Sequence, residues 1–280
     1  MTELPCGLNI VVAHQLEAEP LIDCLGLMPG KSKHGLTIYG NERGLSLIIS
    51  GMGQSAAQAA TARLARHHSE TTRGRAAWLN FGIAGHRSAE IGTSVLANKI
   101  SERASGAAVY PAVLLKSLPS SAVITVAAPE LDYVEDAAFD MEAFGFWSAA
   151  VQCGSLELIQ VCKLISDNPS RPADRVDLAT LKDFVYSCTE PVKQVVAEML
   201  SLSEEFNRIY QDPAEFAQIN KRYRLSVTQQ HQLRALCRRF HALNKDAQLE
   251  EFVGSKAVSG TQLLRNLEAC LAAERPSRSG

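Results

Sequence analysis

The first 200 residues of the chain alternate short apolar segments with segments of helical periodicity, and this alternation constrains the fold more than any other feature. Strands that alternate with helices fold as helical layers over a parallel or mixed sheet. We therefore expect an α/β fold that binds ligands at the carboxyl ends of its strands. The expected strands are 8–13, 36–39, 45–50, 76–81, 94–99, 123–127 and 159–166, and the expected helices are 17–25, 55–68, 141–153 and 178–202.

The charge balance excludes several classes of protein. The 280 residues include 28 Lys and Arg against 30 Asp and Glu, so no overall field draws the chain to nucleic acid or to a membrane surface. The apolar run at 8–13 is too short for a signal peptide or a membrane span. We expect a cytoplasmic protein that binds neither membrane nor nucleic acid.

The cysteine and histidine patterns favour neither a disulfide framework nor a metal site. The seven cysteines are scattered without a CxxC pair, and the seven histidines show no HExxH spacing. We expect reduced thiols packed as small apolar groups, and neither a metal nor an organic cofactor.

The composition changes near residue 203. From there the chain has 12 Lys and Arg against 9 Asp and Glu, whereas residues 1–202 have 16 against 21. We expect an α/β domain over 1–202 and a helical extension over 203–280, the last five residues being disordered. The expected helices of the extension are 203–210, 213–223, 228–243 and 260–273.

One helix of this extension is amphipathic. Within 228–243, an apolar face is formed by Leu233, Leu236, Phe240 and Leu243. We expect this face to pack on the α/β domain or on a second subunit. A basic surface for nucleic acid or a partner protein is the alternative.

Three carboxylates stand at the ends of expected elements. Glu17 follows the first strand, Glu142 opens the helix at 141–153, and Asp167 ends the strand at 159–166. Carboxylates at such positions point toward the ligand edge of an α/β sheet. Helix capping by Glu142 and turn formation by Asp167 are the alternative interpretations.

Two glycine-punctuated segments, 50–53 and 82–85, each follow an expected strand, and we expect both to form turns. Small residues let a ligand approach the backbone, whose free N–H groups can bind a polar edge. Neither segment is a Walker loop or a GxGxxG fingerprint, so a dinucleotide site has little support.

Together these residues resemble the nucleoside phosphorylase/nucleosidase superfamily, and within it the methylthioadenosine/S-adenosylhomocysteine nucleosidases. The DMEA and ISD motifs are the most specific part of the resemblance. It implies a three-layer α/β/α fold with a central mixed sheet, often dimeric, and a purine nucleoside as ligand. The matching stretches are VVAHQLEAEPLI, ISGMGQSAAQAAT, LNFGIAGHRSAEIGTSVLAN, FDMEAFGFWSAAVQCG and VCKLISD, which cover most of residues 8–170.

The resemblance also implies a role for each matching residue. Glu17 corresponds to the general base that polarises the attacking water, and Asp167 to the acid that protonates the purine at N7. Glu142 corresponds to the carboxylate that binds the ribose hydroxyls. Acid and base groups of this kind each contribute roughly 10²–10⁴-fold to a rate. The sugar and base would be lined by Met141, Gly51, Met52, Gly53, Ala84 and Gly85.

We expect hydrolysis of the glycosidic bond of a 5′-modified adenosine by a homodimer. A phosphorylase needs an anion site, and residues 13–19 contain no Arg or Lys. Arg87 is the nearest candidate. A phosphate-dependent phosphorylase and a non-catalytic nucleoside-binding protein remain the alternatives.

The chain departs from the family's pattern in its middle. The span between 92 and 140 is shorter than usual, and it normally supplies the aromatic residue that stacks on the purine. Phe139, Tyr133 and Phe144 are candidates for that residue. Ile83 stands where a small hydroxyl residue is common, and His86 where glycine is common.

Overall fold

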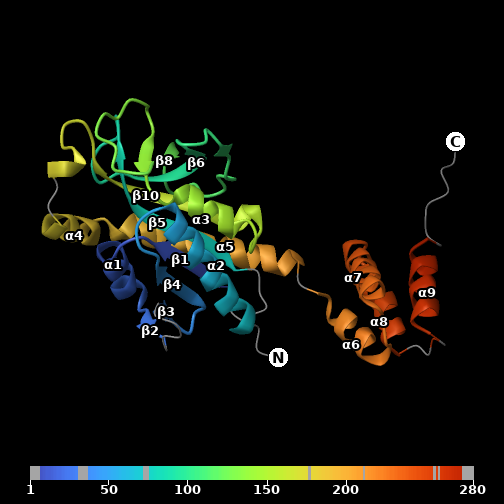
Figure 1. Ribbon diagram of the computed structural model, residues 1–280. Helices are drawn as coiled ribbons and strands as arrows, with labels where there is room; N and C mark the ends of the chain where they lie inside the picture. The colour runs from blue at the N-terminus through green and yellow to red at the C-terminus, as the bar shows by residue number, and fades with distance from the viewer. Residues whose placement is uncertain are drawn as a thin grey trace. The chain divides into compact units, whose positions relative to one another are not determined.

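The computed structural model of the protein describes residues 7–30, 37–71, 76–175, 178–210, 212–254, 257 and 259–272. The chain forms two compact units, Met1–Arg208 and Ile209–Gly280 (Figure 1). The expected boundary after residue 202 falls within helix α5 (Thr189–Tyr210), which runs across the division between the units.

The first unit is built on a mixed sheet. Strands β1, β4, β5 and β10 are parallel neighbours, in the order β4-β1-β5-β10, and shorter antiparallel strands extend the sheet beyond β4. At the other end the sheet closes on itself, because β10 pairs with both β5 and β6 while β9 pairs with both β8 and β5. The strands are β1 (Leu8–Val12), β2 (Met28–Pro29), β3 (Ile38–Gly40), β4 (Leu45–Ile49), β5 (Ala77–His86), β6 (Ser94–Glu102), β7 (Ala108–Val109), β8 (Ser120–Thr125), β9 (Ala138–Asp140) and β10 (Ile159–Asp167).

Helices cover both faces of this sheet, so the expected three-layer arrangement is confirmed (Figure 1). One apolar core packs α1, α4 and α5 on the sheet, and a second packs α2 and α3 on it. Trp78 and Trp147 are buried in the second core. The helices are α1 (Gln15–Leu25), α2 (Gln54–Thr71), α3 (Ala143–Ala150), α4 (Leu178–Ser187) and α5, with 3₁₀ turns η1 (Leu156–Leu158) and η2 (Ala173–Arg175).

The expected turn at 82–85 is wrong, because β5 continues through it to His86. Gly85 lies in register with both Asp167 of β10 and Phe139 of β9. A Cβ on Gly82 would lie 3.0 Å from a carboxylate oxygen of Glu17, and one on Gly85 would lie 2.3 Å from Asp167. These glycines therefore make room for side chains that cross the strand.

Two helix predictions also need correction. The helix expected over 178–202 is two helices that meet near Cys188, and the separate helix expected over 203–210 is the end of α5. The helix expected over 141–153 spans only Ala143–Ala150.

The second unit is a small helical assembly with its own core. It contains α6 (Ala214–Arg222), α7 (Val227–Ala242), α8 (Asp246–Gly254) and α9 (Gly260–Ala272), of which α8 was not expected. Leu233, Leu236 and Phe240 of α7 are buried against the other helices of this unit. The expectation that this face packs on the α/β domain or on a second subunit is therefore wrong. Leu243 is 53% exposed, since α7 ends there. The last five residues lie outside the described residues.

Across the described residues, no helix is both long and apolar enough to pass through a lipid bilayer.

Candidate active site

Glu17 is held at the carboxyl end of β1 by backbone donors. His14 is the N-cap of α1, which places Glu17 in the first helical turn. One carboxylate oxygen, Oε2, accepts the N–H groups of Ala13 and His14 at 2.9 Å each, and Oε1 accepts the N–H of Ile83 at 3.0 Å. The side chain is buried, so three bonds to rigid backbone give it one orientation.

Glu142 reaches the glycine turn that follows β4. Its Oε1 accepts the N–H of Gly53 at 2.7 Å. Gly51 and Gly53 have φ of 83° and 93°, a region that glycine adopts without steric cost, so this segment forms the expected turn. Burial raises the pKa of the Glu142 carboxyl above its ordinary value, and the nearby Lys163 ammonium opposes this effect.

Asp140, rather than Glu142, caps helix α3. Asp140 Oδ2 accepts the N–H groups of Ala143 at 2.7 Å and of Glu142 at 3.2 Å. Glu142 makes no side-chain cap bond, so the capping interpretation of this residue is wrong. Its carboxylate is therefore free to face the site.

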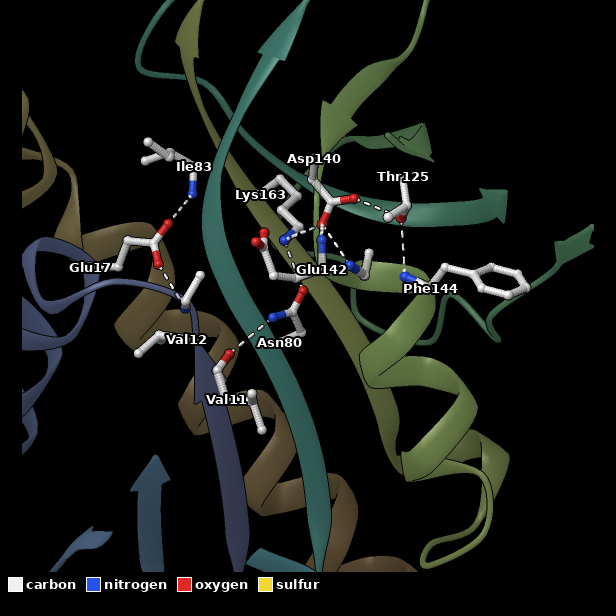
Figure 2. A network of polar contacts seen from close by, with 12 residues as sticks. Val11, Val12, Glu17, Asn80, Ile83, Thr125, Asp140, Glu142, Phe144 and Lys163 are labelled. Carbon is white, nitrogen blue, oxygen red and sulfur yellow. Dashed lines mark hydrogen bonds and ion pairs between the residues drawn. The ribbon is translucent and has the colours of Figure 1, made fainter. Parts of the chain in front are cut away.

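Lys163 lies among these carboxylates and pairs with Asp140 (Figure 2). Its ammonium lies 2.8 Å from Asp140 Oδ2 and donates to Asn80 Oδ1 over 2.8 Å, and the side chain is 1% exposed. Burial by itself lowers the pKa of the Lys163 ammonium, but the charges of Asp140, Glu142 and Glu17 outweigh burial and raise it. Lys163 is therefore a permanent buried cation among three carboxylates.

Asp167 ends β10 with both carboxylate oxygens engaged. Tyr133 donates its hydroxyl to Oδ2 at 2.5 Å, and Ser166 donates to Oδ1 at 2.6 Å. Asp167 is buried and lies in register with Gly85, where the pairing of β10 with β5 is irregular. Asp167 is thus a carboxylate at a strand end, and the interpretation that it forms a turn is wrong.

His86 is a neutral buried histidine at the end of β5. Its Nδ1 accepts the N–H groups of Ser88 and Ala89 at 3.1 Å each, which leaves the ring proton on Nε2, 3.1 Å from Ser121 Oγ. Burial lowers the pKa of His86, and Asp136 opposes this effect. The ring fixes the segment after β5.

The remaining expected site residues differ in their exposure. Ala84 is buried in the second core, Met141 is half-buried, and Met52 is 69% exposed. Of the aromatic candidates for stacking, Tyr133 lies on Asp167, Phe139 packs on the Tyr133 ring, and Phe144 is half-buried.

Several residues of this site were not identified from the sequence. Lys163 and Asn80 each interrupt an apolar strand, which is the local signal that could have marked them. Thr125 donates to Asp140 at 2.8 Å and has no comparable signal. Within the part of the chain that the structure describes, no group of three or more His, Cys, Asp or Glu side chains could hold a metal ion.

The sequence matches no protein-family model and no curated protein, but solved structures match the fold. The 5′-methylthioadenosine nucleosidase of Arabidopsis thaliana superposes with a TM-score of 0.58 at 15% identity, over 70% of this chain and 99% of that one. The chain has the nucleosidase fold. The methylthioadenosine/S-adenosylhomocysteine nucleosidase of Colwellia psychrerythraea, solved with adenine, gives 0.54 at 19% identity over 70% of this chain and 95% of that one.

Futalosine hydrolase of Helicobacter pylori shares the nucleosidase fold as well, with a TM-score of 0.56 at 13% identity over 70% of this chain and all of that one. The predicted fold class is confirmed by these matches. At such identities the likeness concerns the fold alone.

Proposed function

We propose that this chain hydrolyses the N-glycosidic bond of a purine nucleoside, with a 5′-modified adenosine as substrate. The observation that carries the proposal is the placement of three buried carboxylates, Glu17, Glu142 and Asp167, beyond the ends of neighbouring strands of one sheet. Glycosidic cleavage develops positive charge on the sugar and negative charge on the leaving base. Carboxylates near the sugar stabilise its positive charge, and an acid at the base stabilises the negative charge of the leaving group.

Glu17 acts as the general base in this proposal. A carboxylate has about four lone-pair sites, and three of those of Glu17 accept backbone N–H groups. The remaining site can accept a proton from water. Rigid placement of the base keeps that water in one position, which favours attack on the anomeric carbon.

Glu142 and Asp167 act on the two halves of the substrate. Glu142 uses one oxygen for Gly53 and retains acceptor sites for ribose hydroxyls. Asp167 lies at the base and protonates the purine at N7. The glycine turn 51–53 lies against the sugar, with Met52 and Met141 beside it, and Ala84 and Gly85 line the base.

The arrangement favours water over phosphate as the nucleophile. The N–H groups of Ala13, His14 and Ile83, which could bind an anion, all donate to Glu17 instead. Arg87 donates to the carbonyl oxygen of Val134 and is thereby directed to the 126–137 loop between β8 and β9. A carboxylate in the place of an anion site repels phosphate.

The substrate class and assembly form part of the proposal. The names of the proteins that share the fold contain methylthioadenosine, S-adenosylhomocysteine and futalosine. All three compounds are 5′-substituted nucleosides. A homodimer suits the exposed apolar side chains of Tyr110, Val113 and Leu114. We place the reaction in the cytoplasm, in line with the scattered cysteines.

The test incubates the pure protein with methylthioadenosine, S-adenosylhomocysteine or 5′-deoxyadenosine and measures free adenine by chromatography. We expect adenine release without added phosphate, and loss of that release in Asp167→Asn. Release only in the presence of phosphate would identify a phosphorylase. Binding without release, in every condition, would identify a nucleoside-binding protein and contradict the proposal.

A further inference from the structure

We propose that Tyr133 is an internal competitor for Asp167, which must release the carboxylate before a purine can bind there. This inference rests on the proposed function, because it concerns access to the same carboxylate. Tyr133 thereby sets the affinity for the base without taking part in bond cleavage.

The first observation is the position of the phenol. The Tyr133 hydroxyl lies 2.5 Å from Asp167 Oδ2, the residue is 2% exposed, and the N–H of Ala173 approaches the same hydroxyl at 3.4 Å. Burial is the largest cause, and the hydrogen bond to Asp167 the second largest, of a raised pKa of the Tyr133 hydroxyl. The hydroxyl therefore stays protonated and donates. With Ser166 on the other oxygen, both oxygens of Asp167 are engaged by this chain.

The second observation is the packing of the ring. A Cβ added at Gly85 would lie 2.7 Å from Tyr133 Cε1 and 2.3 Å from Asp167 Oδ2. The Tyr133 ring therefore lies against Gly85 and fills the space beside the carboxylate. The Phe139 ring packs edge-on against it, with 6.1 Å between the two ring centroids. A planar base that reached the Asp167 oxygen over Gly85 would need this same space.

The third observation concerns how the 126–137 loop is held. Around Tyr133, Leu131 is 52% and Val134 63% exposed, and Tyr133 itself has a φ of 47°, which bulky residues seldom adopt. The other side-chain hydrogen bonds and ion pairs of the loop lie at the surface, including those of Arg103 with Glu130 and Glu135, while Val126 and Ala137 at its two ends are buried. Exposed pairs contribute little. Tyr133 is thus the buried residue that anchors the middle of the loop, between its buried ends.

The consequence for binding is a population effect. A ligand that binds only the state with Asp167 uncovered has its affinity reduced by the fraction of molecules in that state. Loss of one side-chain hydrogen bond shifts such an equilibrium by roughly two- to tenfold, and by up to about a hundredfold where one partner is charged. Removing the phenolic hydroxyl should therefore tighten binding, whereas removing a catalytic group would slow turnover.

The test measures adenine binding by calorimetry in the full chain and in Tyr133→Phe. We expect adenine to bind Tyr133→Phe about tenfold more tightly or better, the factor set by the lost bond. Tyr186→Phe is the matched control, since Tyr186 donates to Asp23 at 2.6 Å on an exposed surface. Its affinity should equal that of the unmodified chain.

A second readout separates competition from a structural or catalytic role. With a nucleoside that is turned over, Tyr133→Phe should lower KM and leave kcat within about twofold. Tyr133→Ala, which also removes the ring, should bind adenine at least as tightly as Tyr133→Phe. Unchanged or weaker adenine binding in both Tyr133 variants would overturn the inference, and so would a fall in kcat at constant KM. Because adenine binding needs no turnover, a chain that binds but never cleaves contradicts the proposed function alone.

Discussion

The Lys163 ammonium and the Asp140 carboxylate form an ion pair of 2.8 Å in which both side chains are almost fully buried. Asp140 also caps α3 and accepts from Thr125, so the pair connects β10, β8 and the helix that begins directly after Glu142. The pair therefore determines where Glu142 stands relative to Glu17.

Lys163→Met should lower the free energy of unfolding by about 3–5 kcal/mol, because it leaves the buried Asp140 charge without its cation. Urea denaturation followed by circular dichroism measures the change. Lys182→Met is the control, since Lys182 pairs with Glu19 on the surface, and it should change stability by less than about 1 kcal/mol. Equal effects of the two variants would contradict the role given to the buried pair.

Glu17→Gln should reduce the rate of base release by roughly 10²–10⁴-fold, because an amide cannot take the proton from water. Its shape is retained, so the fold should persist, but its NH2 group cannot accept from the backbone N–H groups that Glu17 binds and some stability should be lost. Glu19→Gln changes a half-buried neighbour that pairs with Lys182 at the surface, and it should keep nearly full activity. Progress curves of adenine release compare the rates of the two variants. Similar activity in both would exclude Glu17 as the base.

Gly85→Ala should destabilise the first unit by about 1–3 kcal/mol, because its Cβ would lie 2.3 Å from the Asp167 carboxylate. Gly254→Ala is the matched change, since no atom lies within 4 Å of a Cβ placed there. Thermal unfolding of the two variants should show a lower midpoint for Gly85→Ala alone. A normal midpoint would mean that β5 has more room than this packing implies.

His86 should make stability depend on pH. Its pKa is lowered from 6.5 in the folded chain, chiefly by burial, so the unfolded chain takes up the proton first as the pH falls. The stability from keeping the ring neutral is present above pH 6.5 and is lost progressively below it. Asp136, which faces the ring, opposes the shift but does not reverse it.

The corresponding measurement compares unfolding midpoints at pH 7.5 and 5.5. The drop between these values should be smaller in His86→Asn than in the unmodified chain. His231→Asn, a change at an exposed position, should keep the full drop. An identical drop in all three proteins would show that His86 does not supply the dependence.

Local sequence signals predicted the strands and the three carboxylates, but not the contacts among them. Glu17, Glu142 and Asp167 each stand at an element end, which periodicity and capping chemistry reveal within a few residues. The Lys163–Asp140 pair and the Tyr133–Asp167 bond depend on strands β10, β5 and β9 meeting in the closed part of the sheet. No short-range pattern encodes that closure.

The glycines at 82 and 85 show a second limit of sequence patterns. Glycine occurs both in turns and where another group lies close to the backbone. The composition of the segment 82–85 fits a turn and a strand with such close contacts equally well. Only the side chains of Glu17 and Asp167 lying against β5 show that close approach is the reason here. Helix α8 was missed because it is short and its amphipathic pattern is weak.

The most direct measurement is base release in water enriched in oxygen-18, without phosphate, followed by mass spectrometry of the sugar product. If water activated by Glu17 is the nucleophile, the released sugar carries one oxygen-18 atom per adenine formed, and Glu17→Gln forms neither product at a comparable rate. Absence of adenine, or adenine formed only with phosphate and with an unlabelled sugar phosphate, would contradict the proposed hydrolysis.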